Sequence, residues 1–519
     1  MANASHPVHA EIAVIDFGSQ YTQLIARRLR EVGVFSQIYP FHRYQDVLGR
    51  PEVKGLVLSG GPSSVSDEGA PSVGGDLWEA GIPILGICYG MQLTCERLGG
   101  RLERSNQREY GPARIRVTDP QDPFFAGTPV EQGVWMSHGD RVDALPEGFH
   151  GLAASDSIPF AAAADPRRRV WLVQYHPEVV HTDHGMRMLE NFTRTVCGVT
   201  EEWSASAFVD ETIAEIRAVV GDDHVLCGVS GGVDSTVVAA LLDKAIGGQL
   251  HTVFVDNGVL RHNEADNVEH DLNAFLHRPV VRVDAGDRFL GRLAGVEEPE
   301  RKRVIIGNTF IEVFKEATAA IGHVKFLAQG TLYPDRIESV SVAGPSHVIK
   351  THHNVGGLPA ELGFELIEPL KDLFKDEVRR VGRSLDVPES LLMRHPFPGP
   401  GLAVRILGEV SPERVRLLQA ADHIYIQELL ASGEYNKIWQ AGAVLLPVKT
   451  VGVMGDQRTY EHAVALRAVT SQDGMTADWA RIPGEVLARI SNRIINEVPG
   501  INRVVYDISS KPPSTIEWE

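Results

Sequence analysis

The sequence predicts a multidomain α/β protein, and three observations support this fold class. The chain has 519 residues, and because a domain usually holds about 150 residues, roughly three domains are expected. Short apolar runs alternate with segments of helical period in two separate series, which is the pattern of parallel sheets covered by helices. The composition, with 43% hydrophobic and 23% charged residues, is typical of globular proteins that bury sizeable cores.

The first series runs from Glu11 to about Gly198 and predicts a parallel sheet with covering helices. After its first apolar run, four apolar side chains fall on one helical face: Leu24, Ile25, Leu29 and Val32. Its predicted strands are residues 12–17, 55–58, 82–87 and 170–174. The second and third of these end in glycine-rich turns, where α/β sheets usually hold ligands.

A polar segment from Val199 to Ala207 is predicted to be a linker, and a second α/β series begins after it. The predicted strands of this series are residues 225–229, 252–255 and 280–283. The proline- and glycine-rich stretch Pro396–Pro400 breaks regular structure and marks a further boundary. We therefore expect three domains, at residues 9–199, 200–395 and 396–519.

Charge and cysteine content exclude several classes of protein. Lys and Arg total 50 against 68 Asp and Glu, a formal net charge of −18, which disfavours broad binding to nucleic acid or to an anionic membrane surface. The four cysteines form no CxxC pair, so neither a disulfide scaffold nor a structural zinc site is expected. With no signal-peptide pattern and no apolar run of about 18 residues, a cytoplasmic protein is expected.

A cysteine at a predicted tight turn is the first candidate for chemistry. The run from Pro83 to Gln92 predicts a strand, a sharp turn and a helix start, with Cys88 between Gly86 and Gly90. This is the thiol version of the G-x-S-x-G nucleophile elbow, and the helix N-terminus favours the reactive thiolate. The alternative is a buried core cysteine, since free cysteine is often fully buried, but the elbow context favours the nucleophile.

A base and an orienting carboxylate for this thiol are predicted after a later strand. His176 and Glu178 lie two residues apart on extended chain, so their side chains project to the same side. One histidine among 20 is weak evidence, and His176 taken alone would be a structural residue. Oxyanion donors are expected from backbone N–H groups at Gly60, Gly61 and Tyr89.

A second candidate site is a loop between the strand at residues 225–229 and a helix predicted at residues 236–245. Its sequence is Ser230-Gly231-Gly232-Val233-Asp234-Ser235. Backbone N–H groups in such a loop bind anions, although glycines at a strand end are also ordinary turn residues. The lysine of a Walker A loop is missing, which disfavours a kinase or motor ATPase.

Two carboxylates are candidates beside this loop. Asp234 is a candidate Mg²⁺ ligand, because Mg²⁺ usually lies between one or two carboxylates and substrate phosphates. Val255 and Asp256 end the next strand, where a nucleoside would lie, and Asp256 could equally be a turn former.

Taken in order, these motifs resemble the glutamine-hydrolysing GMP synthetase family from about Ile12 to Glu519. The elbow with His176-Pro177-Glu178 is similar to the triad-type class I glutamine amidotransferases, and residues 230–235 are similar to the PP-loop of ATP pyrophosphatases. Three further stretches match the family: residues 330–335, residues 350–357 and the tail Lys511-Pro512-Pro513-Ser514-Thr515-Ile516-Glu517-Trp518-Glu519.

The resemblance implies a class I glutamine amidotransferase domain, an ATP pyrophosphatase (adenine nucleotide alpha hydrolase-like) domain and a smaller α+β C-terminal dimerisation domain. It implies that glutamine is hydrolysed at Cys88 through a thioester and that the ammonia reaches a second site. There XMP is adenylylated by ATP, pyrophosphate leaves, and ammonia displaces AMP to give GMP. The implied partners are XMP, ATP, L-glutamine and Mg²⁺, with a second copy of the chain in a homodimer.

The resemblance also implies roles for particular residues. His176 would be the general base and later the acid, oriented by Glu178. Residues implied to surround glutamine or its oxyanion are Gly60, Gly61, Tyr89, Gln92, His138, Gly139 and Asp140. Residues implied to bind ATP are Ser230, Gly231, Gly232, Val233, Asp234, Ser235, Val255 and Asp256, with Asp234 at the metal. Residues implied to contact XMP or to form the lid are Arg303, Asp335, Lys350, Lys511, Thr515 and Glu517.

Two other functions remain open from the sequence. Another glutamine-dependent ATP pyrophosphatase, such as one making NAD or asparagine, would share the adenylylation chemistry but carry a different glutaminase. A nucleotide-sensing or scaffold protein could retain both folds without activity, although intact chemical residues at both sites argue against it.

Overall fold

The computed structural model describes residues 10–335, 363–454, 457–471 and 476–519, apart from residues 277 and 323. The described part of the chain divides into two compact units, one of residues 10–211 with 333–335 and the other of residues 212–332 with the described residues from 363 onward. In the described part of the chain, no helix combines the length and the apolar character needed to cross a bilayer.

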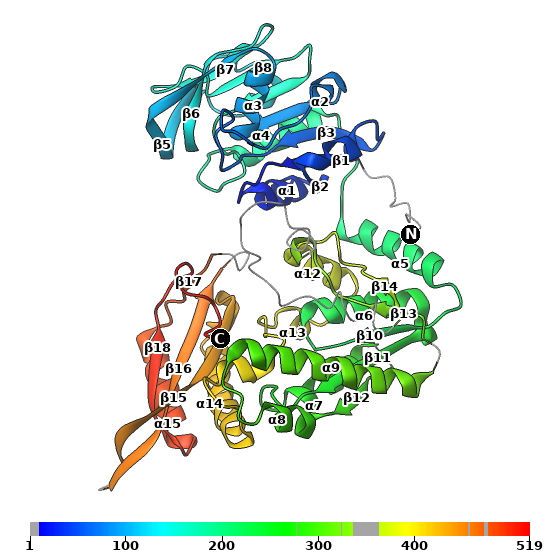
Figure 1. Cartoon of the computed structure of the whole chain (residues 1–519), viewed down its shortest axis with the longest axis vertical. Helices are drawn as coiled ribbons and strands as arrows, with labels where there is room; N and C mark the ends of the chain where they lie inside the picture. Colours follow the sequence, from blue (N-terminus) through cyan, green and yellow to red (C-terminus); the bar gives the residue numbers. More distant parts are fainter. Residues whose placement is uncertain (1–9, 277, 323, 336–362, 455–456, 472–475) are drawn as a thin grey trace. The chain divides into compact units, whose positions relative to one another are not determined.

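The first unit contains a nine-stranded mixed sheet (Figure 1). In spatial order its strands are β2 (Phe35–Pro40), β1 (Glu11–Asp16), β3 (Val53–Leu58), β4 (Ile84–Ile87), β9 (Val170–Val173), β8 (Ala162–Asp165), β7 (His150–Ser155), β5 (Arg101–Val117) and β6 (Glu131–Ala144). The strands from β2 to β9 run parallel, and the other pairings are antiparallel. The four strands predicted for this series are present, with ends that differ by one or two residues.

Strands β1, β3, β4 and β9 of the parallel half are buried on both faces, which is why they are largely apolar runs. The edge strand β2 is mostly half-buried. The side chains from Ile12 to Ile15 in β1 are fully buried. Helices of this unit are α1 (Thr22–Glu31), α2 (Asp76–Glu79), α3 (Tyr89–Arg97) and α4 (Gly185–Glu190). On the predicted apolar face of α1, Ile25 and Leu29 are fully buried, whereas Leu24 and Val32 are half-buried.

The second unit contains a five-stranded parallel sheet. In spatial order its strands are β12 (Val281–Asp284), β11 (Leu250–Asp256), β10 (Val225–Gly228), β13 (Phe326–Ala328) and β14 (Glu365–Ile367). Helices belonging to this α/β part are α6 (Val233–Ile246), α7 (Glu264–Leu276), α8 (Gly286–Leu293), α9 (Pro299–Ile321), α12 (Lys375–Ser384) and α13 (Glu389–Leu392). The chain leaves β10 on one side toward β11 and later returns on the other side as β13, so the loop after β10 lies at a topological switch point.

The rest of the second unit is an α+β arrangement that packs on the same core. Its elements are α14 (Pro412–Ala431), β15 (Gln440–Met454), β16 (Gln457–Thr470), β17 (Asp478–Trp479), α15 (Gly484–Glu497) and β18 (Ile501–Asp507). One hydrophobic cluster joins Leu226 and Val253 of the parallel sheet to Leu418 and Val464 of this part. Residues 212–332 and the described residues from 363 onward therefore form one compact body, and the expected boundary at residue 396 stays a prediction.

The predicted linker at residues 199–207 is shorter than expected. Helix α5 (Ala205–Val220) begins inside it. The hydroxyl of Ser204 accepts a hydrogen bond from the N–H of Ala207 at 3.2 Å, which satisfies one of the free donors at a helix start.

Candidate active sites

Cys88 lies in a strained turn between β4 and α3. Its backbone has φ 51° and ψ −101°, a conformation that residues with a side chain rarely adopt outside functional sites. The N–H of Cys88 donates to the carbonyl of Val173 in β9 at 2.8 Å, and the N–H of Gln92 donates to the carbonyl of Cys88 at 3.1 Å. The turn therefore presents the thiol at the carboxyl edge of the sheet and at the N-terminus of α3.

The two glycines flanking the turn are required by sterics. A Cβ atom at Gly90 would lie 2.4 Å from the carbonyl oxygen of Leu58, and one at Gly86 would lie 2.9 Å from the backbone of Gly90. Real Cβ atoms do not approach backbone atoms so closely, so any side chain at these positions would push β3, β4 and α3 apart. Close packing around the turn therefore explains why the motif has glycine at these two positions.

His176 and Glu178 follow β9, which pairs in parallel with β4. The carboxyl ends of adjacent parallel strands meet at one edge of the sheet, so His176 lies close enough to Cys88 for the thiol to influence its pKa. The Sγ of Cys88 itself donates to the carbonyl of Ser137 at 3.5 Å. Nδ1 of His176 lies 2.7 Å from Oε1 of Glu178, and both side chains are buried. Burial by itself lowers the pKa of His176, but the charge of Glu178 and the contacts with Cys88 outweigh it, and the pKa stands well above its ordinary value.

Backbone N–H groups lie beside His176 and directly after Cys88 in the chain. A Cβ atom at Gly60 would be 3.3 Å from Cε1 of His176, and one at Gly61 would be 3.1 Å from Cγ of Tyr89, so this glycine pair lies against both residues. Within the described part of the chain, the N–H groups of Gly60 and Tyr89 meet no hydrogen-bond acceptor. Free N–H groups beside a nucleophile are suited to hold a developing oxyanion.

The residues expected around glutamine lie on α3 and β6. The amide Nε2 of Gln92 donates to the carbonyl of Asp140 at 2.8 Å, and none of the described side chains crowds Gly139. His138 is buried, and its Nε2 lies 3.3 Å from Oε2 of Glu109. The phenol of Tyr89 donates to the carbonyl of Pro71 at 2.6 Å, and burial raises its pKa to about 12.

Three residues that the motif analysis missed support this site. The ring of Tyr21 contacts His176 edge-on, with the ring centroids 5.2 Å apart. The hydroxyl of Thr182 donates to the carbonyl of His176 at 2.6 Å and fixes its backbone. Glu109 faces His138. None of the three stands in a recognisable motif, so only the tertiary contacts identify them.

The second site is the loop between β10 and α6. Helix α6 begins at Val233, three residues earlier than predicted, so Val233, Asp234 and Ser235 form its first turn. The hydroxyls of Ser230 and Ser235 lie 3.2 Å apart, and the N–H of Gly232 donates to the Ser230 hydroxyl at 3.3 Å. Hydroxyl and N–H donors thus converge at a helix N-terminus, which is an anion-binding arrangement.

The loop receives a cation from a distant helix. Nζ of Lys375, the first residue of α12, lies 3.3 Å from Oδ2 of Asp234, and Gly330 packs directly against Asp234. Oδ1 of Asp234 is buried and has no hydrogen-bond partner. This orphaned oxygen fits a Mg²⁺ ion shared with phosphates, and among the described residues no cluster of three His, Cys, Asp or Glu side chains offers a separate metal site.

The two residues predicted to bind a nucleoside at the end of β11, Val255 and Asp256, make different contacts. The side chain of Val255 is buried in the core, so only its backbone could meet a ligand. Asp256 accepts a hydrogen bond from the N–H of Gly258 at 3.0 Å and pairs with Arg282 at 2.7 Å. Asp256 therefore fulfils the turn-forming role that the sequence left open.

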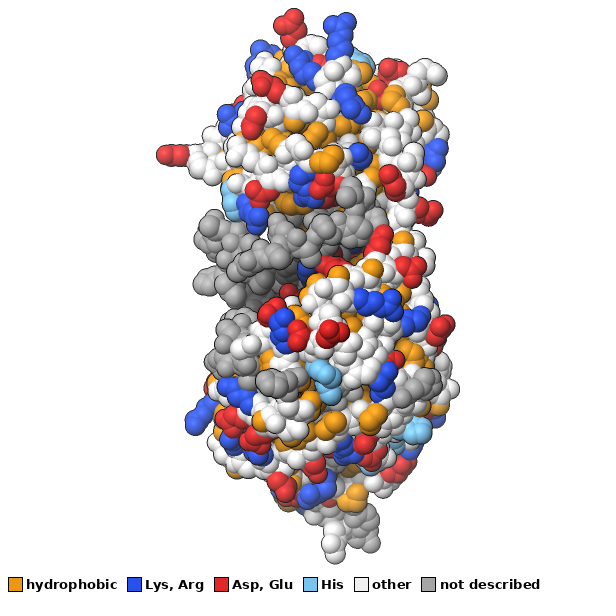
Figure 2. Space-filling model, turned by 90° about the vertical axis from the view of Figure 1, so that its right-hand side faces the viewer, with side chains coloured by type: hydrophobic (Ala, Val, Ile, Leu, Met, Phe, Trp, Pro, Cys, Tyr) orange, Lys and Arg blue, Asp and Glu red, His pale blue; other side chains and the backbone are white. Residues whose placement is uncertain are grey.

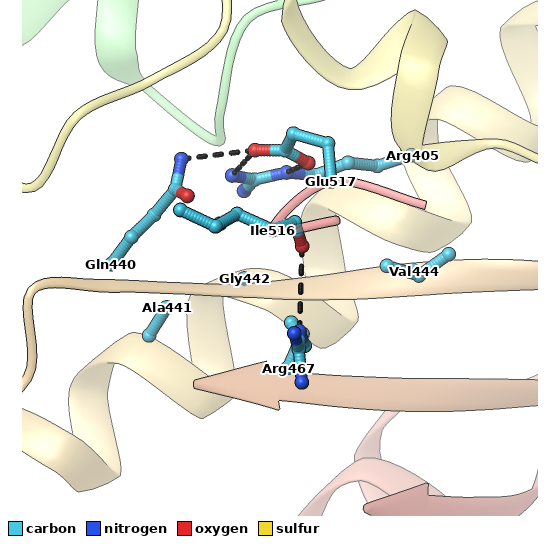
Figure 3. A pocket seen from close by; sticks show the side chains of 8 residues that line it. All are labelled: Arg405, Gln440, Ala441, Gly442, Val444, Arg467, Ile516 and Glu517. Carbon is cyan, nitrogen blue, oxygen red and sulfur yellow. Dashed lines mark hydrogen bonds and ion pairs between the residues drawn. The ribbon is translucent and has the colours of Figure 1, made fainter. Parts of the chain in front are cut away.

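The C-terminal tail is docked on the second unit and lines a small pocket (Figure 3). The carboxylate of Glu517 accepts two hydrogen bonds from the buried Arg405, at 2.7 and 3.0 Å, and one from Gln440 at 2.9 Å. Arg467 donates to the main-chain oxygens of Thr515 and Ile516 at 3.1 and 3.4 Å. Burial raises the pKa of Glu517, but the charge and hydrogen bonds of Arg405 together with the charges of Arg261 and Arg303 outweigh it, so the pKa lies below its ordinary value.

Of the other residues expected to contact XMP or to form the lid, only some lie near the C-terminal tail. Arg303, near the N-terminus of α9, donates to the main-chain oxygen of Glu519 at 2.5 Å, so it lies with the tail. The backbone of Lys511 forms a bridge with Ala477. Asp335 is the last described residue before the gap at 336–362, and Lys350 lies outside the described residues.

Family models match three consecutive parts of the chain. The model for class-I glutamine amidotransferases matches residues 13–196, the model for NAD synthase matches residues 205–274, and the model for the GMP synthase C-terminal domain matches residues 427–518.

Curated relatives match nearly the whole chain. A protein named GMP synthase (glutamine-hydrolysing) from Nitratiruptor sp. is 57% identical over 512 residues, covering 98% of this chain and 99% of that protein. Proteins of the same name from Nitratidesulfovibrio vulgaris and Chlorobium chlorochromatii are each 56% identical, with the same two coverages. The chain therefore belongs to the family of glutamine-hydrolysing GMP synthases.

Proposed function

We propose that this chain catalyses the glutamine-dependent amination of XMP to GMP, with ATP cleaved to AMP and pyrophosphate. The observation that carries the proposal is the presence, in one chain of this family, of a buried Cys88–His176–Glu178 array and a separate phosphate loop without its own lysine. The first suits release of ammonia from an amide, and the second suits a pyrophosphate leaving group.

In the first site, His176 takes the proton of Cys88, and the thiolate attacks the side-chain carboxamide carbon of glutamine. The N–H groups of Gly60 and Tyr89 hold the oxyanion. His176 then gives its proton to the departing nitrogen, so that ammonia and a thioester form. Water, deprotonated by His176, hydrolyses the thioester to glutamate and restores the thiol. Glu178 stabilises the imidazolium that both steps need.

In the second site, the xanthine O2 of XMP attacks the α-phosphorus of ATP, and pyrophosphate leaves. Donors at Ser230, Gly232 and Ser235 hold the pyrophosphate, and Lys375 offsets its charge. Asp234 would hold Mg²⁺, which supplies charge neutralisation when it is bound. Ammonia then attacks the C2 carbon of the adenylylated base, and AMP leaves with the former O2 to give GMP.

The pocket beside the tail is proposed as the acceptor subsite. Arg405, Gln440 and Glu517 bring a cation, an amide and a carboxylate together. Because they hydrogen-bond to one another, a purine base that binds there has to replace some of these contacts with its own. Lys511 and Arg303 are proposed near the phosphate, and Asp335 and Lys350 are kept as proposed lid residues.

A homodimer through residues 396–519 is proposed on the strength of exposed apolar side chains. Val451, Val453, Tyr460 and Val505 on β15, β16 and β18 are between 41% and 73% exposed, an unusual density for a solvated sheet. Analytical ultracentrifugation tests it, and a monomer at all concentrations would contradict it. A cytoplasmic location is proposed because all four cysteines are free thiols.

Nucleic acid is not proposed as a partner. On the face shown in Figure 2, Lys and Arg side chains are scattered among Asp and Glu, consistent with the net charge of −18.

The deciding experiment identifies products from XMP, MgATP and glutamine by chromatography and mass spectrometry. GMP with equal amounts of AMP and pyrophosphate is expected. The match of residues 205–274 to NAD synthase makes a carboxylate acceptor the alternative, so an acceptor screen that measures AMP release should accompany it. AMP release with a carboxylate acceptor but not with XMP would overturn the proposal.

A further inference from the structure

An arginine from the segment after α13 holds the phosphate loop by its backbone. Nη1 of Arg394 donates to the carbonyl of Gly231 at 2.9 Å. Because the peptide unit is planar and trans, fixing this carbonyl turns the N–H of Gly232 to the opposite side, where it meets the Ser230 hydroxyl. Gly231 has φ +73°, and a Cβ atom there would lie 2.7 Å from Arg394, so this contact needs glycine.

The other end of the Arg394 guanidinium is bound by a buried carboxylate. Nη2 of Arg394 pairs with Oε1 of Glu264, the first residue of α7, whose side chain is 7% exposed. The second oxygen of Glu264 accepts the N–H of Arg261 at 2.9 Å. With one nitrogen on the loop and another on Glu264, Arg394 is held at two points.

The contacts continue to the pocket that the tail lines. Nη2 of Arg261 donates to the carbonyl of Ala441 at 2.8 Å, and its Nε lies 3.3 Å from Oδ2 of Asp422. The guanidinium groups of Arg261 and Arg405 lie 5.1 and 5.3 Å from the ring centroid of Phe397, three residues after Arg394. Ala441 and Arg405 line the pocket that contains Glu517.

We propose that Arg394 is a positioning residue that sets the donor geometry of the phosphate loop and, through Glu264 and Arg261, couples this loop to the tail-lined pocket. The proposal deepens the proposed function and rests on it. Arg394 touches the loop carbonyl and a carboxylate and is not itself a catalytic residue. Occupancy of either subsite favours the arrangement in which the relay is complete, so binding at one should strengthen binding at the other by the same factor.

The test measures binding directly, so that it does not depend on turnover. Titration calorimetry on the full chain gives the Kd of a non-hydrolysable MgATP analogue without and with saturating XMP, for the wild type, Arg394→Lys, Glu264→Gln and the control Arg288→Lys. Arg288 forms a comparable two-hydrogen-bond pair with Glu316 at the surface of the same unit. Thermal melts run in parallel measure the stability of each variant.

We expect Arg394→Lys and Glu264→Gln to raise the Kd of the analogue alone about tenfold, the effect of one charge-assisted hydrogen bond. The factor by which saturating XMP tightens binding of the analogue should fall at least threefold. The control should keep both values. In the ammonium-driven reaction, the KM for MgATP should rise while kcat at saturation falls less than threefold, a split that a loss of folded protein would not produce.

Unchanged analogue affinity in Arg394→Lys, or an equal loss in Arg288→Lys, would overturn the positioning role. Loss of affinity with an unchanged effect of XMP in both variants would overturn the coupling. If the wild type binds the analogue but makes no GMP, the proposed function fails while the positioning role is still decided by the first titration.

Discussion

The Nζ atom of Lys375 lies 3.3 Å from Oδ2 of Asp234, 141 residues earlier in the chain. A phosphate loop that has no lysine of its own therefore receives one from the N-terminus of α12. Both side chains are partly exposed, at 37% and 29%, so the pair can open and turn toward a phosphate at little cost.

Replacing Lys375 with methionine should raise the KM for MgATP at least tenfold with either nitrogen donor, because one charge-assisted contact to a phosphate is lost while the side-chain volume is kept. Steady-state kinetics measure the change. Lys437→Met, which removes a surface lysine paired with Glu434 at 2.8 Å, is the matched control. An unchanged KM in Lys375→Met would restrict Lys375 to a structural ion pair.

Asp234→Asn should impair adenylylation with glutamine and with ammonium alike, since its free Oδ1 is the oxygen proposed to hold Mg²⁺. Pyrophosphate release at several Mg²⁺ concentrations measures it. The expected signature is partial recovery at high Mg²⁺. Release at the wild-type rate and the same Mg²⁺ dependence would assign Asp234 to loop structure.

Cys88→Ala should abolish glutamine-dependent synthesis and spare synthesis driven by ammonium, because only the thiolate of the first site is removed. The two rates are measured on the same preparation. His176→Ala should behave in the same way. Equal loss with both nitrogen donors would contradict a two-site enzyme, and full glutaminase activity in His176→Ala would exclude that histidine.

Glu178→Gln should lower the pKa of His176, because the carboxylate charge that opposes the effect of burial is removed. In the wild type the raised pKa means that the imidazolium stabilises the folded state. This stabilisation is complete below the unfolded pKa of about 6.5 and is lost as the pH rises through the higher folded value. The stability lost in Glu178→Gln should therefore be largest below about pH 6.5.

Chemical denaturation across the pH range measures this difference, and glutaminase kcat should fall about 100-fold or more in the same variant. Glu190→Gln, at an exposed carboxylate paired with Arg187 at 2.9 Å, serves as the control. A difference that grows with rising pH would show that His176 is neutral in the folded state.

Because the tail is docked, we expect mutations of two of its residues to have different effects on folding stability and on XMP binding. Glu517→Gln leaves the buried Arg405 without its charged partner and should lower the free energy of unfolding by about 3 kcal/mol. It should also weaken the binding of XMP. Lys511→Ala should weaken the binding of XMP more than the binding of ATP, without a comparable loss of folding stability. Thermal melts beside XMP titrations separate the two, and unaltered XMP binding in both variants would remove the tail from the acceptor subsite.

The sequence alone determined the fold class and the family, and it predicted the candidate residues of both sites. The Cys88 turn could be predicted because a turn this tight leaves room only for glycine on either side of the cysteine. The pair His176 and Glu178 could be predicted because alternate residues of an extended chain face the same side. The seven predicted strands are present, and in six of them the apolar run reflects burial on both faces. The seventh, β12, is a largely exposed edge strand.

Tertiary structure decided which distant residues complete the sites. Lys375 reaches Asp234 across 141 residues, and Arg394 reaches Gly231 across 163 and Glu264 across 130. Ion pairs of this kind have no periodicity or spacing that a sequence pattern could display, because any basic residue placed there by packing would serve. The tail shows the same limit. Its short polar composition predicts fraying, but buried basic residues that face it, among them Arg405, Lys302 and Arg467, hold it in place.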